Sequence, residues 1–178
     1  MHEIEKDFSG QFPILERMAF FNHAGVAPIS GPAAAALRQY AVQSEGSAYV
    51  GAGWYRRVCV AKQAAARLLG ARGSHEVAFT ANTSSGLALV ANGLAWQPGD
   101  NVVITNVEYP ANRYPWENLI RRGVELVEVA ELPGGCVDVE DVCNAVSDRT
   151  RVVSISHVQY ASGFRIDLEP IAEAVHSA

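Results

Sequence analysis

Three hydroxyl side chains stand together in the stretch TANTSSG, where Thr83, Ser84 and Ser85 follow Asn82. The apolar pattern that comes next predicts a helix, so these residues lie at its N-terminus. The free N–H groups and the positive dipole end of a helix N-terminus favour an anion, and hydroxyls add further donors. Ser, Thr and Asn are also preferred helix caps, but a cap needs only one such residue. We therefore expect this turn to bind a phosphate group, with capping as the alternative.

Other motifs for phosphate or nucleophilic chemistry do not match. The turn lacks the Lys of a Walker A loop and the Gly that precedes the Ser of a nucleophile elbow. The stretch GAGW, residues 51–54, begins like a dinucleotide fingerprint. Arg56 occupies the third Gly position of that pattern, and no strand is predicted before it, so a flexible loop is the better interpretation.

Two further turns carry side chains that could contact a planar ligand. Tyr109 follows a predicted strand, and it could stack on a ligand ring or pack over the edge of the sheet. The stretch SHVQYASG follows another strand and offers His157, Gln159 and Tyr160 as hydrogen-bonding groups. A lone His such as His157 is more often a satisfied core residue than a ligand.

The elements that must position these turns alternate along the chain. Runs rich in Val and Ile predict strands at 76–80, 101–106, 124–129 and 151–158. Helices are predicted at 32–43, 55–69, 84–96, 111–122, 139–147 and 168–176. This alternation is typical of βαβ units, so we expect an α/β fold with a mostly parallel sheet and flanking helices. Ligands of such sheets bind where strands end and helices begin, which is where all three turns lie.

Length, composition and charge limit the class of protein. The 178 residues, 49% hydrophobic and 19% charged, indicate a globular chain with a real core. A net charge of −5 gives no reason to expect a nucleic acid or an anionic membrane as a partner. No apolar run approaches the ~20 residues of a membrane span, and the charged N-terminus is not a signal peptide. The three cysteines form no CxxC motif and no metal site is expected, so reduced thiols in the cytoplasm are predicted.

Taken together, the turns resemble those of fold type I enzymes that use pyridoxal phosphate. The closest likeness is to the class V aminotransferase group, which includes cysteine desulfurases, kynureninase and isopenicillin N epimerase-like proteins. The segments that carry the likeness are FFNHAGVAPIS, VAFTANTSSGLALVANGL, PGDNVVITNVEYPANRYPW and DRTRVVSISHVQYASGFRIDL, in the family's order. The resemblance implies a partial large domain of the aspartate aminotransferase-like fold.

The resemblance also implies roles for residues at matching positions. Thr83 and Ser84 would bind the cofactor phosphate, and Tyr109 would stack on the pyridine ring. Cysteine desulfurases usually have a His at the position of Tyr109, and it takes part in proton handling, so this departure argues against a desulfurase. Tyr160 falls where desulfurases place an Asn near the ring hydroxyl, and the VQY run is more similar to kynureninase and epimerase-like members.

The N-terminal part of the chain resembles the segment that lines the family's substrate pocket. Asn22 and His23 would face the substrate there, which the family implies is an amino acid or an amine. The implied domains are a substrate-pocket segment at 1–30 and a partial pyridoxal phosphate-binding large domain at 31–178, without the C-terminal small domain. Family members are typically dimers, so a homodimer is expected of the full-length protein.

Pyridoxal chemistry also needs a Schiff-base lysine and an acid opposite the ring nitrogen. The family carries both after the helix that is predicted here from Leu168, and the chain ends at Ala178. Lys6 and Lys62 are the only lysines, and neither matches the required position. We therefore expect the N-terminal part of such an enzyme, with no catalytic residue of its own and no turnover alone. A non-catalytic partner of a full-length relative is one alternative, and a nucleotide-binding Rossmann-like domain, which tight NAD binding would favour, is another.

Overall fold

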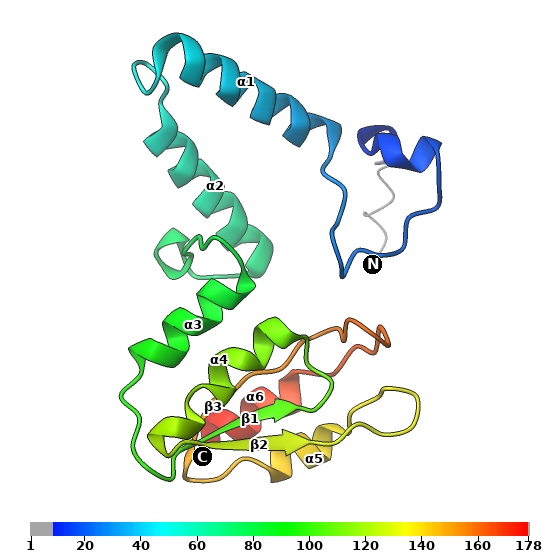
Figure 1. Ribbon diagram of the computed structural model, residues 1–178, viewed down its shortest axis with the longest axis vertical. Coiled ribbons are helices and arrows are strands. Elements are labelled where there is room, and N and C mark those ends of the chain that lie inside the picture. Colours follow the sequence, from blue (N-terminus) through cyan, green and yellow to red (C-terminus); the bar gives the residue numbers. More distant parts are fainter. Residues whose placement is uncertain (1–8, 178) are drawn as a thin grey trace. The chain divides into compact units, whose positions relative to one another are not determined.

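One buried strand, β1 (Asn101–Thr105), lies at the centre of the sheet in the computed structural model, which describes residues 9–177 (Figure 1). It pairs in parallel with β2 (Glu125–Val129) on one side and with β3 (Thr150–Val153) on the other, in the order β2-β1-β3. All five residues of β1 are buried, as expected of a Val- and Ile-rich central strand of a parallel sheet. The predicted α/β fold with a parallel sheet is confirmed.

Helices cover both faces of this sheet. They are α3 (Thr83–Gly93), α4 (Tyr114–Glu117), α5 (Val139–Asn144) and α6 (Glu169–Ser177). Because side chains of a strand alternate between faces, Val102 and Ile104 enter one core and Val103 enters the other. The first core also contains Ala91, Trp96, Trp116, Leu119 and Val124, and the second contains Val129, Val137, Val142, Ile166 and Ile171. Helices α3 and α4 therefore pack on one face, and α5 and α6 on the other.

The chain divides into two compact units, Met1–Phe79 and Thr80–Ala178, and the sheet belongs to the second. The described part of the first unit consists of η1 (Ser9–Gln11), η2 (Pro13–Glu16), α1 (Gly31–Ser47), α2 (Trp54–Leu69) and η3 (Ser74–Glu76). Ser30 caps α1 by accepting a hydrogen bond from the Ala33 amide, and Gly70, at φ 68°, ends α2 in the left-handed conformation. Both predicted helices of this unit are confirmed.

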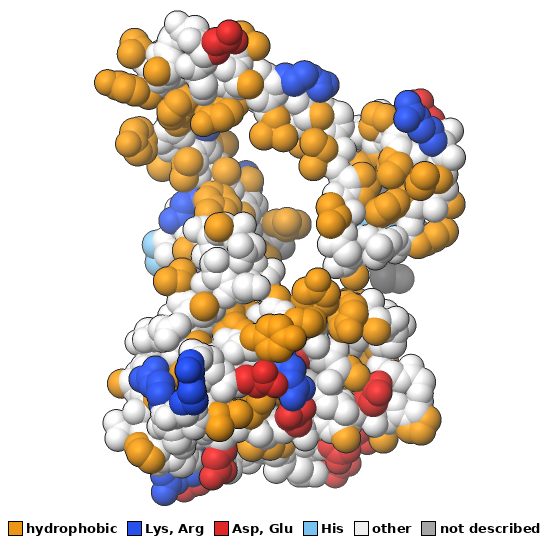
Figure 2. Space-filling model, in the orientation of Figure 1, with side chains coloured by type: hydrophobic (Ala, Val, Ile, Leu, Met, Phe, Trp, Pro, Cys, Tyr) orange, Lys and Arg blue, Asp and Glu red, His pale blue; other side chains and the backbone are white. Residues whose placement is uncertain are grey.

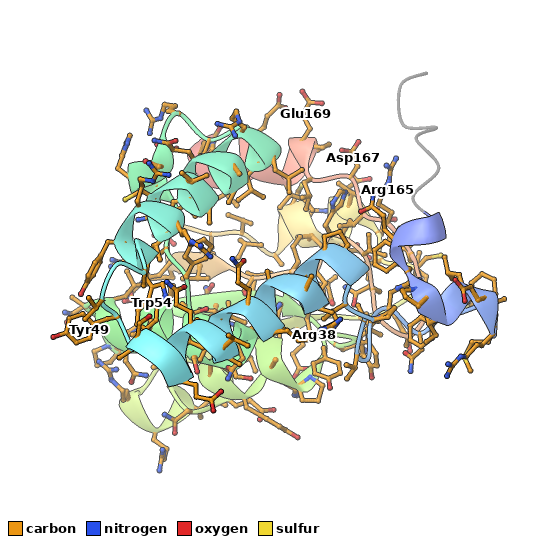
Figure 3. All side chains as sticks on the ribbon, turned by 90° about the horizontal axis from the view of Figure 1, so that it is seen from above. Arg38, Tyr49, Trp54, Arg165, Asp167 and Glu169 are labelled. Atoms are coloured by element: carbon orange, nitrogen blue, oxygen red, sulfur yellow. The ribbon has the colours of Figure 1, made fainter. Side chains whose placement is uncertain are left out.

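The first unit buries few of its apolar side chains. Among the residues of this unit that the structure describes, Ala52 and Ala66 are the buried hydrophobic ones, whereas hydrophobic side chains gather on the surface of α1 and α2 (Figure 2). Tyr49 lies in the turn between these two helices and Trp54 begins α2 (Figure 3), and the Trp54 ring packs 5.4 Å from that of Tyr40. Across residues 9–177, none of the helices has both the length and the apolar character that crossing a membrane requires.

The predicted strand at 76–80 is wrong. Residues 74–76 form the short helix η3, and Val77 is extended, with φ −110° and ψ 124°. The segment 77–80 pairs with no strand in the described part of the chain. Its β-branched and aromatic residues favour an extended backbone, but a strand also needs a neighbour to supply ladder hydrogen bonds.

The single helix predicted at 111–122 is also wrong. The structure has three short pieces instead, which are η4 (Pro110–Asn112), α4 and η5 (Ile120–Arg122). Pro110 and Pro115 each stand in the first turn of a piece, where proline is tolerated. A continuous helix would place Pro115 in its interior, where proline removes a backbone hydrogen bond and clashes with the preceding turn.

Candidate functional site

The N-terminus of α3 has spare hydrogen-bond donors. Asn82 is the cap, and its side-chain oxygen accepts from the Ser85 amide at 2.8 Å. Because Asn82 does the capping, the hydroxyls of Thr83 and Ser84 are not needed for it. These two residues are exposed, and within residues 9–177 neither their hydroxyls nor their amides make a hydrogen bond. The turn therefore presents two amides and two hydroxyls to an incoming anion.

Tyr109 and Tyr160 come from different turns and meet at the edge of the sheet. Tyr109 follows β1, and Tyr160 lies beyond β3, yet their ring centroids are 5.1 Å apart in an edge-to-face arrangement. Such an aromatic pair stabilises the fold by more than the burial of its apolar surface alone. Each ring is still 48% exposed, so both can contact a ligand.

A shallow groove joins the helix terminus to the first of these rings. Ser84 and Ala88 of α3 line one part of it, and Tyr109, Ala111 and Tyr114 line another. The groove therefore combines anion-binding groups with an aromatic face, which are the two features that a phosphorylated planar ligand needs. A pyridoxal phosphate molecule has this chemistry, and the residues present fit it.

Glu108, next to Tyr109, is the centre of a buried polar network that was not predicted. Its side chain is 6% exposed and accepts five hydrogen bonds. The donors are Thr105 Oγ1 at 3.1 Å, Asn112 Nδ2 at 2.9 Å, the Ser156 amide at 2.7 Å, Ser156 Oγ at 2.6 Å and Gln159 Nε2 at 3.1 Å. Glu108 lies three residues past the end of β1, and nothing in the local sequence distinguishes it from an exposed turn residue.

The network also explains why β3 is shorter than the strand predicted at 151–158. The Ser154 amide still donates to the Val103 carbonyl at 2.9 Å. Two residues later, the Ser156 amide donates to Glu108 and not to a strand. The chain then turns back, with Gln159 and Phe164 joined by a backbone hydrogen bond of 2.9 Å.

Beside the site, an ion pair ties the turn after β1 to β2. The Arg113 guanidinium donates to both carboxylate oxygens of Glu128, at 2.7 and 2.8 Å, and its Nε donates to Glu117. These hydrogen bonds, first from Glu128 and then from Glu117, raise the pKa of Arg113 further above its ordinary value. Arg113 therefore stays charged at every working pH and acts here as a structural clamp.

Asn22 and His23 lie in the first unit, and both are exposed. The Asn22 side chain accepts a hydrogen bond from the Gly25 amide at 3.2 Å, and the His23 ring packs edge-on against Phe20 at 5.1 Å. These contacts order the segment locally. The roles of both residues toward a substrate stay predictions, as do the domain boundaries at 30 and 31.

Comparison with known proteins gives a consistent assignment. The family model "Aminotransferase class-V" matches residues 20–178. A "Probable cysteine desulfurase" from Methanothermobacter thermautotrophicus is 32% identical over 178 residues, which cover 96% of this chain and 44% of that protein. The chain thus spans less than half the length of this curated relative.

Solved structures share the fold. The apo cysteine desulfurase from Thermococcus onnurineus NA1 superposes with a TM-score of 0.82 at 22% identity, covering 99% of this chain and 46% of that one. A variant of the protein C-DES, with glycine covalently linked to its pyridoxal phosphate cofactor, superposes with a TM-score of 0.80 at 23% identity, covering 94% of this chain and 45% of that one. The expected family is confirmed by the match of its model to residues 20–178, and the chain belongs to the class V aminotransferases.

Proposed function

We propose that this chain forms the cofactor-binding part of a pyridoxal phosphate enzyme that acts on an amino acid or an amine. The observation that carries the proposal is the N-terminus of α3, where Asn82 does the capping and leaves Thr83 and Ser84 free to bind a phosphate. The groove from Ser84 to Tyr109 supports it, because it adds an aromatic face for the ring. The similarity to C-DES, whose structure includes this cofactor, supports it further.

Each site residue has a defined task in this proposal. The amides and hydroxyls of Thr83 and Ser84 donate to the phosphate oxygens, and the helix dipole adds to the attraction. The Tyr109 ring packs on the face of the pyridine ring and fixes its plane. Tyr160 offers its phenol to the ring hydroxyl. When bound, pyridoxal phosphate serves as an electron sink for bond cleavage beside the substrate amino group.

A pair of variants separates cofactor binding from helix capping. In the full-length protein, Ser84→Ala should weaken pyridoxal phosphate binding by about 1 to 3 kcal/mol, because a charge-assisted hydrogen bond is lost. It should leave the melting temperature nearly unchanged. Asn82→Ala should instead lower the free energy of unfolding by about 1 kcal/mol, because it removes the cap.

The measurements are equilibrium titration of the apo protein with pyridoxal phosphate and denaturant unfolding of both variants. Unchanged affinity in Ser84→Ala would show that the turn does not bind the phosphate. Thr83→Ala provides a second, independent test of the same turn.

The substrate proposal can be tested through Tyr109. Since the resemblance places a proton-handling His at this position in desulfurases, we expect slow sulfide release from cysteine by the complete protein. Transamination, lyase and epimerase reactions on a panel of amino acids should be assayed in parallel. Rapid release of sulfide by the wild-type protein would overturn this expectation and would indicate the same activity as the cysteine desulfurases to which the chain is similar.

The assembly proposed for the complete protein is a cytoplasmic homodimer without a nucleic-acid or membrane partner. The exposed apolar side chains of α1 and α2, among them Leu37, Tyr40 and Val42, support an interface. The net charge of −5 supports the absence of a nucleic-acid or membrane partner. The three free cysteines support a cytoplasmic location. Sedimentation of the purified protein tests the oligomeric state.

A further inference from the structure

The hydrogen bonds of Glu108 join the two turns that carry the aromatic pair. Thr105 and Asn112 come from β1 and the turn after it, whereas Ser156 and Gln159 come from the segment after β3. Tyr109 is the next residue after Glu108, and Tyr160 is the next residue after Gln159. Each tyrosine is thus bonded through the backbone to a member of the network.

The network is arranged around a charged acceptor. All five groups around the Glu108 carboxylate donate to it, which is the pattern of an ionised carboxylate. Among the ion pairs formed by residues 9–177, none involves Glu108. The charge is therefore held by neutral donors fixed in place, and a buried carboxylate is tolerated only if these donors stay in position.

We propose that Glu108 is a positioning residue, which holds Tyr109 and Tyr160 together as one ring-binding unit. The expected effect on cofactor binding rests on the proposed function. The positions of the two tyrosine rings can be measured without cofactor. Without Glu108, each turn could move separately, and the 5.1 Å arrangement of the two rings would be lost in part of the molecules. A smaller fraction of the molecules would then have the rings arranged to bind pyridoxal phosphate, and the apparent affinity would fall in proportion to that fraction.

Glutamine cannot replace Glu108 in this network, although its shape is the same. Asn112 donates to Glu108 through Nδ2, while its Oδ1 accepts from Trp116 Nε1 at 3.1 Å. Trp116 Nε1 can only donate, so the Asn112 amide cannot turn over to accept from a new donor. If the NH2 group of the glutamine faces Asn112 Nδ2, two donors are opposed, and if it turns the other way it faces the Ser156 amide, which also can only donate.

The test compares Glu108→Gln with Asp100→Asn as a matched control. Asp100 precedes β1 at its opposite end and is also 6% exposed, and its carboxylate accepts from the Gln97 amide at 2.8 Å. Ser156→Ala serves as a milder variant, because it removes one hydroxyl donor and keeps the amide bond to Glu108. All three substitutions are made in the full-length protein.

Crystal structures of the apo proteins give the first readout, and titration with pyridoxal phosphate gives the second. We expect the Tyr109–Tyr160 arrangement to be lost in Glu108→Gln, loosened in Ser156→Ala and intact in Asp100→Asn. If about one molecule in ten keeps the arrangement, the apparent Kd of Glu108→Gln rises about tenfold.

An intact pair in Glu108→Gln, or an equal loss of affinity in Asp100→Asn, would overturn the inference. If Glu108→Gln does not fold, an unchanged pair and unchanged affinity in Ser156→Ala overturn it instead. Failure of the wild-type protein to bind pyridoxal phosphate, with the ring pair lost only in Glu108→Gln, would refute the proposed function and leave the positioning role standing.

Discussion

Tyr109 presents a half-exposed ring at the edge of the sheet, so its contribution to binding can be separated into ring and hydroxyl. Tyr109→Phe keeps the face that would stack on a pyridine ring and should bind pyridoxal phosphate within about twofold of wild type. Tyr109→Ala removes the face and should weaken binding by about 1 kcal/mol, the usual size of an aromatic pair. Titration of both variants checks this.

Tyr55→Ala is the control for this prediction, because Tyr55 is 92% exposed on α2 and no role is proposed for it. Equal affinities of Tyr109→Ala and the wild-type protein would mean that Tyr109 packs over the sheet edge without binding the ring.

Individual side chains differed in how far the sequence could predict them. Thr83 and Ser84 carry a local signal because hydroxyl residues at a helix N-terminus can bind an anion, and Tyr109 carries one because it follows a strand of a parallel sheet. The sequence left capping open for the serine turn, and the structure gives that task to Asn82. The Glu108 network could not be predicted, since its donors lie up to 51 positions away and meet only when β1 and β3 are paired.

At the scale of elements, the alternation of strands and helices was predicted correctly for most of the chain, whereas two assignments failed for tertiary or local reasons. The segment 76–80 has the composition of a strand and lacks a neighbouring strand. The segment 111–122 has an apolar helical pattern, but Pro115 interrupts it. Composition reports what a segment prefers, and it does not report whether a partner is available.

The turn at Gly134 and Gly135 gives an element-scale prediction. Both residues have positive φ angles, of 93° and 76°. A methyl group on Gly135 would lie 2.6 Å from Cβ of Ser162, whose hydroxyl donates to the Gly135 carbonyl at 2.8 Å. Gly135→Ala should therefore lower the free energy of unfolding by about 2 to 4 kcal/mol, through backbone strain and overpacking together.

Gly134→Ala is the matched control, because a methyl group there meets open space. It should cost only about 1 to 2 kcal/mol, from backbone strain alone. Denaturant unfolding of both variants checks the difference, and equal losses would show that the contact with Ser162 does not constrain the turn.

At the scale of the whole molecule, the two units differ in how much core they contain. The unit Thr80–Ala178 contains both hydrophobic cores, whereas Ala52 and Ala66 are the buried hydrophobic residues described in Met1–Phe79. A chain that buries so little apolar surface cannot offset the conformational entropy of folding. We expect a fragment of residues 80–178 to unfold cooperatively on heating, and a fragment of residues 1–79 to show no such transition.

Circular dichroism of the two fragments during heating makes this comparison. A sharp transition in residues 1–79 would contradict the prediction, as would a gradual one in residues 80–178. A sharp transition in residues 1–79 would also show that this unit folds without burying the exposed apolar residues of α1 and α2 in an interface.

The strand order β2-β1-β3 has a consequence for synthesis of the protein on the ribosome. The central strand β1 is made first, and both of its neighbours come later. β3 emerges roughly 50 residues after β1, so at 5–20 residues per second the apolar segment NVVIT waits about 2 to 10 seconds for its second partner. During that time the backbone groups of β1 that face the place of β3 are open to other nascent chains. Chaperone demand during translation should therefore be greatest between the emergence of β1 and that of β3.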